Sequence, residues 1–203
     1  MRGNQQVTAQ HATLYLDDKN EVNRVLAQGD VRGEVQGRSN ISSHADSAEF
    51  FLAEKGSALR NAVLSGDVQL HSTGAQIADA SAGRIVLRLC REKDLQKVHA
   101  ERDVRLRQQQ PVDPANSSRK GQDVEIAAPA MDALLVNGHL DRAQTDASGQ
   151  ITIAQAGSDQ KAVITAAKFL LRFDNRNRLS TLHGAPDARI RTLTPGQPDR
   201  TDE

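Results

Sequence analysis

Aspartate recurs along the chain in a phrase that reads Gly-Asp-Val in its clearest copies. Asp30 and Asp67 follow glycine, Asp103 follows arginine and Asp187 follows proline. Repeated carboxylates can serve as general acids or bases, or as calcium ligands. Aspartate beside glycine is also typical of turns and bends, because both residues tolerate unusual backbone angles. We therefore predict that these aspartates mainly shape the backbone, and acid–base catalysis and calcium binding remain as alternatives.

Histidine is the next residue type that could do chemistry, because imidazole is a common metal ligand. No two of the six histidines show a metal-binding spacing such as H-x-x-x-H. They are His11, His44, His71, His99, His139 and His183. The sequence also lacks a nucleophile elbow, a phosphate-binding loop and a dinucleotide-binding motif. We predict that the protein binds no metal and no cofactor and is not an enzyme.

Composition argues against several other classes of protein. The chain has 203 residues, with 26 basic and 26 acidic side chains and 2% aromatic residues. Proteins that bind nucleic acid usually carry a basic excess, and those that bind single strands also stack bases on aromatic rings. We therefore predict no nucleic-acid partner. No run of 18 apolar residues is present, and residues 1–7 lack the apolar core of a signal peptide.

The elements that carry these residues form a repeat. The Gly-Asp phrase recurs, with losses, as AQGDVRGEV (27–35), LSGDVQL (64–70), AERDVRL (100–106), DASGQITI (146–153) and GAPDARI (184–190). The aligned positions 30, 67, 103, 150 and 187 are 37, 36, 47 and 37 residues apart. The long interval contains the polar stretch 108–123, which we predict to be an inserted loop.

An alternating apolar run precedes each copy of the phrase. The runs are HATLYL (11–16), DSAEFFL (46–52), SAGRIVLRL (81–89), PAMDALLV (129–136) and AAKFLLRF (166–173). Polar, turn-forming residues separate each run from the Gly-Asp phrase. A period of two residues predicts strands rather than helices. We therefore predict five stacked β-hairpins over residues 7–193, after an extension at 1–6 and before a disordered polar tail at 194–203.

The Gly-Asp step lies midway along the longer, second strand of each predicted hairpin. Glycine inside a strand marks a bulge or a bend, and aspartate disfavours regular strand pairing. We predict a corner that bends every long strand at the same height. One hairpin cannot bury its apolar face alone, but stacked copies can. The predicted fold is therefore all-β, as an open and curved sheet with an apolar lining.

This pattern resembles the OstA-like domain, which periplasmic lipopolysaccharide-transport proteins of the LptA and LptC kind carry. The resemblance rests on SHADSAEFFL with AVLSGDVQL (43–52 and 62–70), on IADASAGRIVLRL with KVHAERDVRL (77–89 and 97–106), and on VITAAKFLLRF (163–173). It implies an open β-jelly roll that holds the acyl chains of lipopolysaccharide, or of a similar acylated glycolipid, in an apolar groove.

The resemblance also implies partners and a location. The expected partners are other OstA-like domains, docked edge to edge by β-augmentation, and the inner-membrane ABC transporter complex. The expected location is the periplasm, where an N-terminal segment outside this chain could anchor the protein to the inner membrane. The docking edges would be the strands around residues 7–16 and 179–193, because an open stack has an unpaired strand at each end.

Large apolar side chains that alternate on the first and second strands are the candidate lining of the groove. Such a lining would stabilise a bound acyl chain by removing its methylene groups from water. The candidates are Leu14, Leu16, Val31, Phe50, Leu52, Val68, Leu70, Ile85, Leu87, Val104, Leu106, Ile151, Phe169, Leu171 and Ile190. The alternative for each of them is ordinary core packing.

Two other functions are compatible with stacked hairpins. A structural β-solenoid scaffold would self-assemble through its open sheet edges and would bind no lipid. A carbohydrate-active β-helix enzyme would need clustered acids and exposed aromatic residues, which the sequence does not offer.

Overall fold

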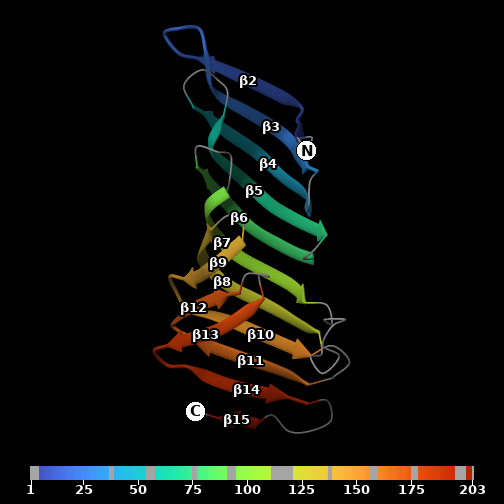
Figure 1. Ribbon diagram of the computed structural model, residues 1–203, viewed down its shortest axis with the longest axis vertical. Helices are drawn as coiled ribbons and strands as arrows, with labels where there is room; N and C mark the ends of the chain where they lie inside the picture. Colours follow the sequence, from blue (N-terminus) through green and yellow to red (C-terminus); the bar gives the residue numbers. More distant parts are fainter. Residues whose placement is uncertain are drawn as a thin grey trace.

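The computed structural model describes residues 5–36, 39–53, 58–74, 77–90, 95–110, 121–136, 139–155, 160–174, 178–194 and 200–202. These residues are almost entirely in β-strands, and they include no helix that is long and apolar enough to cross a membrane. Fifteen strands form one antiparallel sheet, which stays open from β1 and β2 at one end to β15 at the other (Figure 1). The predicted all-β, open β-jelly roll of stacked antiparallel hairpins is confirmed.

The strands follow the predicted hairpins in order along the chain. Their bounds are β1 Gln5–Thr8, β2 His11–Leu16, β3 Val22–Val35, β4 Ser39–Leu52, β5 Leu59–Gly74, β6 Ile77–Leu89, β7 Leu95–Gln110, β8 Gln122–Val136, β9 His139–Thr145, β10 Gly149–Gln155, β11 Lys161–Ala166, β12 Lys168–Phe173, β13 Leu179–Ala185, β14 Arg189–Leu193 and β15 Arg200–Asp202. In the fourth repeat, β9 and β10 together form the second strand, and in the fifth repeat β13 and β14 do so.

The predicted corner is present as a line of β-bulges. Gly66 and Asp67 have φ angles of +78° and +40°, and the strand register shifts between Ser65 and Val68. The same shift occurs at Gly29–Asp30 and at Arg102–Asp103. Two residues there oppose one residue of the partner strand, which bends and twists the sheet. In the third copy the bend forms although Arg102 replaces glycine, and Arg102 and Asp103 have φ angles of +68° and +57°.

The corner divides the sheet into two arms, and strands β3 to β8 cross from one arm to the other (Figure 1). Arm A has the strand order β2-β3-β4-β5-β6-β7-β8-β9-β12-β13. Arm B has the order β1-β3-β4-β5-β6-β7-β8-β10-β11-β14-β15. Most buried apolar residues of both arms belong to one core cluster, so the arms pack against each other along their inner faces.

The strand ends differ from the predicted boundaries in three places. β1 begins at Gln5, inside the predicted extension, and β7 and β8 extend to Gln110 and from Gln122, inside the predicted loop 108–123. The strands extend because glutamine side chains do not interrupt a ladder that backbone groups form. The prediction of a disordered tail is wrong for residues 200–202, since β15 pairs with the free edge of β14. Residues 111–120 and 195–199 lie outside the described part.

Candidate functional site

A continuous row of mostly apolar side chains crosses the inner face of arm A. Each member lies directly opposite the next on the neighbouring strand, from β2 to β13. The row, called here the arm A row, consists of Leu14, Val25, Phe50, Ala62, Leu87, Val98, Ala133, Ala143, Leu171 and Leu182. Phe50, Leu87, Val98, Ala133, Leu171 and Leu182 belong to the core cluster or pack against it.

Arm B carries a matching row on its own inner face. The arm B row consists of Val7, Gly33, Ser43, Leu70, Ala80, Leu106, Ile126, Ile151, Ile164 and Ile190. Leu70, Leu106, Ile126, Ile151 and Ile164 lie in or against the same core cluster as the arm A row. The two rows therefore face each other across the interior of the molecule.

Most of the candidate groove residues come together in this interior. Seven are buried members of the core cluster: Val31, Val68, Ile85, Val104, Ile151, Phe169 and Leu171. Four are half-buried and pack against it: Phe50, Leu70, Leu87 and Leu106. Leu52 is half-buried, whereas Leu14, Leu16 and Ile190, on strands at the two ends of the sheet, are exposed. The apolar inner face is thus a property of the fold, and lipid binding to it stays a prediction.

Sequence reasoning missed many of the small residues that line the same interior. Ala27, Ala45, Ala48 and Ala82 are almost fully buried next to the corner. Ala48 precedes Phe50 by two residues, a spacing that puts both on one face of the strand. The bulges at the corner separate the other three alanines from the nearest candidates on their strands. For Ala48 and Ala82, the alanine near the start of each first strand was the available signal, but alanine alone does not distinguish a lining position from a neutral one.

Exposure changes along each row, although every member lies at a similar distance from the corner. At the N-terminal end, Leu14 is 60% exposed and Val7 is 49% exposed. Along β8 to β12, Leu171 and Ile151 are fully buried. The residues between these extremes, such as Phe50, are half-buried. The rows are therefore exposed to solvent at both ends of the stack, at Leu14 and Val7 and again at Ile190, and are most buried along β8 to β12.

Phe169 of β12 is buried in the same region, along β8 to β12. Its backbone N–H donates a hydrogen bond of 2.9 Å to Oγ1 of Thr145, which is itself buried. Its ring lies beside Gly149 of arm B and Gly184 of arm A. A Cβ atom on Gly184 would fall 2.9 Å from Cε1 of the ring, and one on Gly149 would fall 3.6 Å from Cδ2. The absence of side chains at both glycines makes the space that the ring fills.

The repeated aspartates lie along the corner, as predicted, rather than in one catalytic cluster. Asp30 forms ion pairs of 3.0 Å with Arg32 and with His44. The hydrogen bond from Arg32 is the main reason that the pKa of Asp30 lies below its usual value, and His44 adds to the effect. Across the described ranges, no three His, Cys, Asp or Glu side chains are grouped so that they could hold a metal ion.

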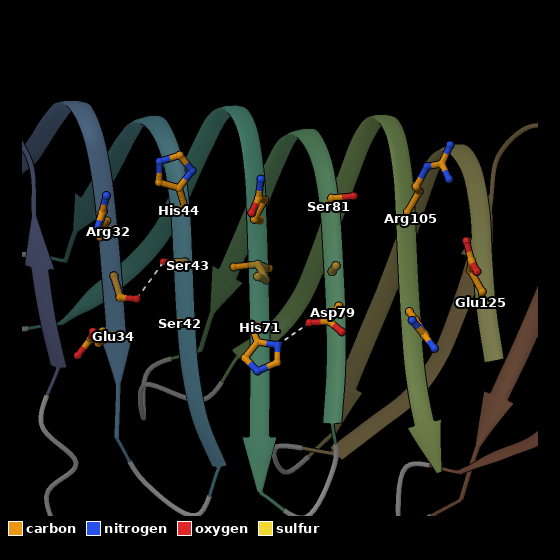
Figure 2. A pocket seen from close by; sticks show the side chains of 15 residues that line it. Arg32, Glu34, Ser42, Ser43, His44, His71, Asp79, Ser81, Arg105 and Glu125 are labelled. Atoms are coloured by element: carbon orange, nitrogen blue, oxygen red, sulfur yellow. Dashed lines mark hydrogen bonds and ion pairs between the residues drawn. The ribbon is translucent and has the colours of Figure 1, made fainter. Parts of the chain in front are cut away.

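Polar side chains gather on the outer face of arm B, around a shallow hollow of about 760 Å³ (Figure 2). Arg32 and Glu34 on β3, His71 on β5 and Arg105 on β7 are among the residues that line it. His71 and Asp79 interact across β5 and β6. Leu70 is the one candidate groove residue in the lining. The mixture of positive and negative exposed groups is typical of a solvated sheet face.

A second polar group lies on the outer face of arm A. Nζ of Lys97 is 2.9 Å from Oδ1 of Asp132, and Nδ1 of His99 is 3.1 Å from the same oxygen. Partial burial raises the pKa of Asp132, but hydrogen bonds from Lys97 and His99 and their positive charges outweigh it, so the pKa lies below its usual value. These groups tie β7 to β8 and do not face the interior.

Comparison with known proteins gives one finding at the level of structure. No family model matches the chain, and no curated protein is similar to it in sequence. The crystal structure of LptH, the LptA-homologous periplasmic component of the lipopolysaccharide transport device of Pseudomonas aeruginosa, is similar to the chain. The TM-score is 0.46 with 19% sequence identity, over 78% of this chain and 95% of that chain. At this level of similarity, function is inferred from the geometry of the chain itself.

Proposed function

We propose that the protein is a non-enzymatic periplasmic carrier that binds the acyl chains of lipopolysaccharide, or of a similar acylated glycolipid, between its two arms. One observation carries the proposal. The arm A row and the arm B row face each other through the stack, and their N-terminal members Leu14 and Val7 are exposed to water. An apolar interior that is open to solvent at its N-terminal end offers a continuous path from solvent to a dry lining.

The energy of transfer supports an acyl chain as the ligand. Each methylene group that leaves water contributes roughly 0.8 kcal/mol, so a chain of about twelve carbons gains on the order of 9 kcal/mol. Large exposed apolar side chains that gather in one region mark interaction sites. Val35 and Ile41 lie near the same open end and are exposed as well. A lipid bound there would cover these side chains and leave its sugar headgroup outside.

The open sheet edges support the second part of the proposal, which is docking to similar domains by β-augmentation. Within the described residues, β1 and β2 pair only with β3, and β13 pairs only with β12. Each edge can therefore accept a further antiparallel or parallel strand. In this proposal, docked domains form a path between the inner and outer membranes, and the inner-membrane ABC transporter complex supplies the lipid.

Photo-crosslinking at two adjacent residues of β4 tests the proposal. Phe50 lies on the inner arm A row, whereas Phe51 pairs with Arg24 and Asn61 on the outer face, and both are half-buried. A photo-reactive phenylalanine at each position would be irradiated with purified lipopolysaccharide. We expect an adduct at position 50 and little or none at position 51.

Two results would contradict lipid binding. Equal adducts at positions 50 and 51 would mean that the lipid coats the surface without entering the interior. No adduct at position 50, together with filaments in electron micrographs, would favour the alternative of a self-assembling scaffold. Leu171→Asp is a poor test, because Leu171 is fully buried and a carboxylate there would disrupt folding itself.

A further inference from the structure

Along the arm B row, the size of the inward-facing side chains differs between the two halves of the stack. In the arm B row, strands β3, β4 and β6 contribute Gly33, Ser43 and Ala80, whereas β8, β10 and β11 contribute Ile126, Ile151 and Ile164. In the N-terminal half, β1 to β7, these small side chains are interspersed with Val7, Leu70 and Leu106. In the C-terminal half, β8 to β15, strands β8, β10, β11 and β14 each have a large branched side chain, isoleucine, in this row.

Burial follows the same division. Phe50, Leu70, Leu87 and Leu106 in the N-terminal half are large apolar residues, and all four remain half-buried. Near the corner, side chains of both halves are buried, Ile85 and Val68 as well as Phe169. Among the members of the two rows, the large buried ones are Ile126, Ile151 and Leu171, and all three lie in the C-terminal half. Away from the corner, the N-terminal half therefore leaves the large members of the two rows half-buried or exposed, whereas β8, β10 and β12 bury theirs.

The two arms touch each other where the interior is filled. A Cβ atom on Gly184 of β13 would lie 3.0 Å from Cβ of Ala166 of β11, and 2.9 Å from Cε1 of Phe169. β13 belongs to arm A and β11 to arm B, and Figure 1 shows β12 and β13 drawn across β10 and β11. The Phe169 ring therefore lies in the contact between the arms, and little space remains beside it.

We infer that Phe169, Leu171, Ile126 and Ile151 form an internal plug, and that acyl chains bind only in the N-terminal half, between β2 and β7. This inference rests on the proposed function and makes it more specific. A bound acyl chain enters past Leu14 and Val7, lies against Phe50 and Leu87, and stops at the plug. The domain then holds a chain of limited length instead of letting it slide through from end to end.

Two matched leucines provide the first test. Leu87 and Leu182 both belong to the arm A row and are both half-buried, but they lie on opposite sides of Phe169 along the stack. A photo-reactive amino acid at either position would be irradiated with purified lipopolysaccharide and, separately, with palmitate. We expect adducts at position 87 and at least tenfold fewer at position 182. In Phe169→Ala, adducts at position 182 should rise towards those at position 87.

The outcomes separate the plug from the proposed function. Equal adducts at positions 87 and 182 of the otherwise unchanged protein would overturn the plug and leave lipid binding intact. No adducts at position 87 would overturn the lipid-binding proposal itself, and the plug with it. If Phe169→Ala fails to fold, as judged by circular dichroism, Phe169→Leu replaces it. The comparison of adducts at positions 87 and 182 with Phe169 unchanged tests the plug in either case.

The dependence of affinity on acyl-chain length gives a second test that needs no substitution. Affinity for saturated fatty acids should rise about fourfold for each added methylene while the chain still enters the N-terminal half. Once the chain reaches the plug, the rise should stop, and in Phe169→Leu it should stop at a longer chain. A rise that continues without a plateau up to the solubility limit would overturn the inference.

Discussion

The ring of Phe169 packs directly on the backbone of Gly184, so closely that a Cβ atom on Gly184 would lie 2.9 Å from Cε1 of the ring. Phe169 is on β12 and Gly184 is opposite it on β13. The two arms of the sheet come together at this contact, because Ala166 of arm B lies beside the same glycine. A glycine in this position therefore sets how deeply the aromatic ring can enter the interior.

Gly184→Ala should lower the free energy of unfolding by about 1–3 kcal/mol, the usual cost of overpacking a filled core. Urea denaturation measures the change. Thr181→Ala, at an exposed position of the same strand, is the matched control and should change stability by less than about 0.5 kcal/mol. Phe169→Leu should partly restore the stability of Gly184→Ala. Two additive, independent effects would argue against the contact.

Asp67→Val should destabilise the protein by about 1–2 kcal/mol, because a β-branched residue is strained at the φ angle of +40° found there. Asp67→Asn should be close to neutral, since asparagine also tolerates this region. Asp67 is exposed, so neither substitution removes buried surface. Thermal unfolding of the two variants measures the difference. Equal melting temperatures would mean that the corner does not depend on its backbone angle.

Asp132→Asn should make the free energy of unfolding fall less as the pH is lowered. The pKa of Asp132 in the folded protein lies below its ordinary value of 3.8, so the unfolded chain binds a proton at a higher pH than the folded chain does. The stability that this carboxylate contributes is present above the unfolded pKa. It is lost as the pH falls through the folded pKa.

Urea unfolding at neutral pH and at a pH below 3.8 measures this effect. The free energy of unfolding of Asp132→Asn should fall less between the two conditions than that of the unchanged protein. Lys97→Gln should act in the same direction, because it removes the nearest positive charge. An unchanged acid dependence in both variants would show that this cluster contributes nothing to the linkage.

Arg142→Glu should stabilise the protein by about 0.2–1 kcal/mol at low salt. Arg142 on β9 and Arg172 on β12 lie directly opposite each other on the outer face of arm A, and both are exposed. Like charges in this position repel, whereas opposite charges attract. Arg142→Gln should give a smaller gain, and high salt should reduce both gains. A destabilising effect of both substitutions at low salt would contradict the repulsion.

Period-two alternation predicted which face each side chain occupies, but not how deeply it is covered. Leu14 and Leu171 show the difference, because they belong to the same inner row and yet are 60% and 0% exposed. Alternation is local along one strand, whereas burial depends on what the opposite arm places nearby. Phe169 fills the interior because Gly149 and Gly184, which are far apart in the sequence, both lie beside its ring and leave room for it.

The corner could be predicted because its cause is also local. Gly66 and Asp67 adopt positive φ angles that these two residues tolerate, wherever the rest of the chain lies. β15 was missed for the opposite reason. Its pairing with β14 depends on an unpaired edge elsewhere in the molecule rather than on the composition of residues 200–202.

Unbroken cross-strand rows also constrain how proteins of this shape can change in length. Insertion of one residue into β5 would turn every following side chain of that strand to the opposite face, so Leu70 would point to solvent and Gln69 inward. Duplication or loss of a whole hairpin of about 37 residues would keep every face unchanged, because each hairpin contacts only its neighbours. Genetic variation in length should therefore be tolerated in whole modules, and the reach of the molecule would grow in discrete steps.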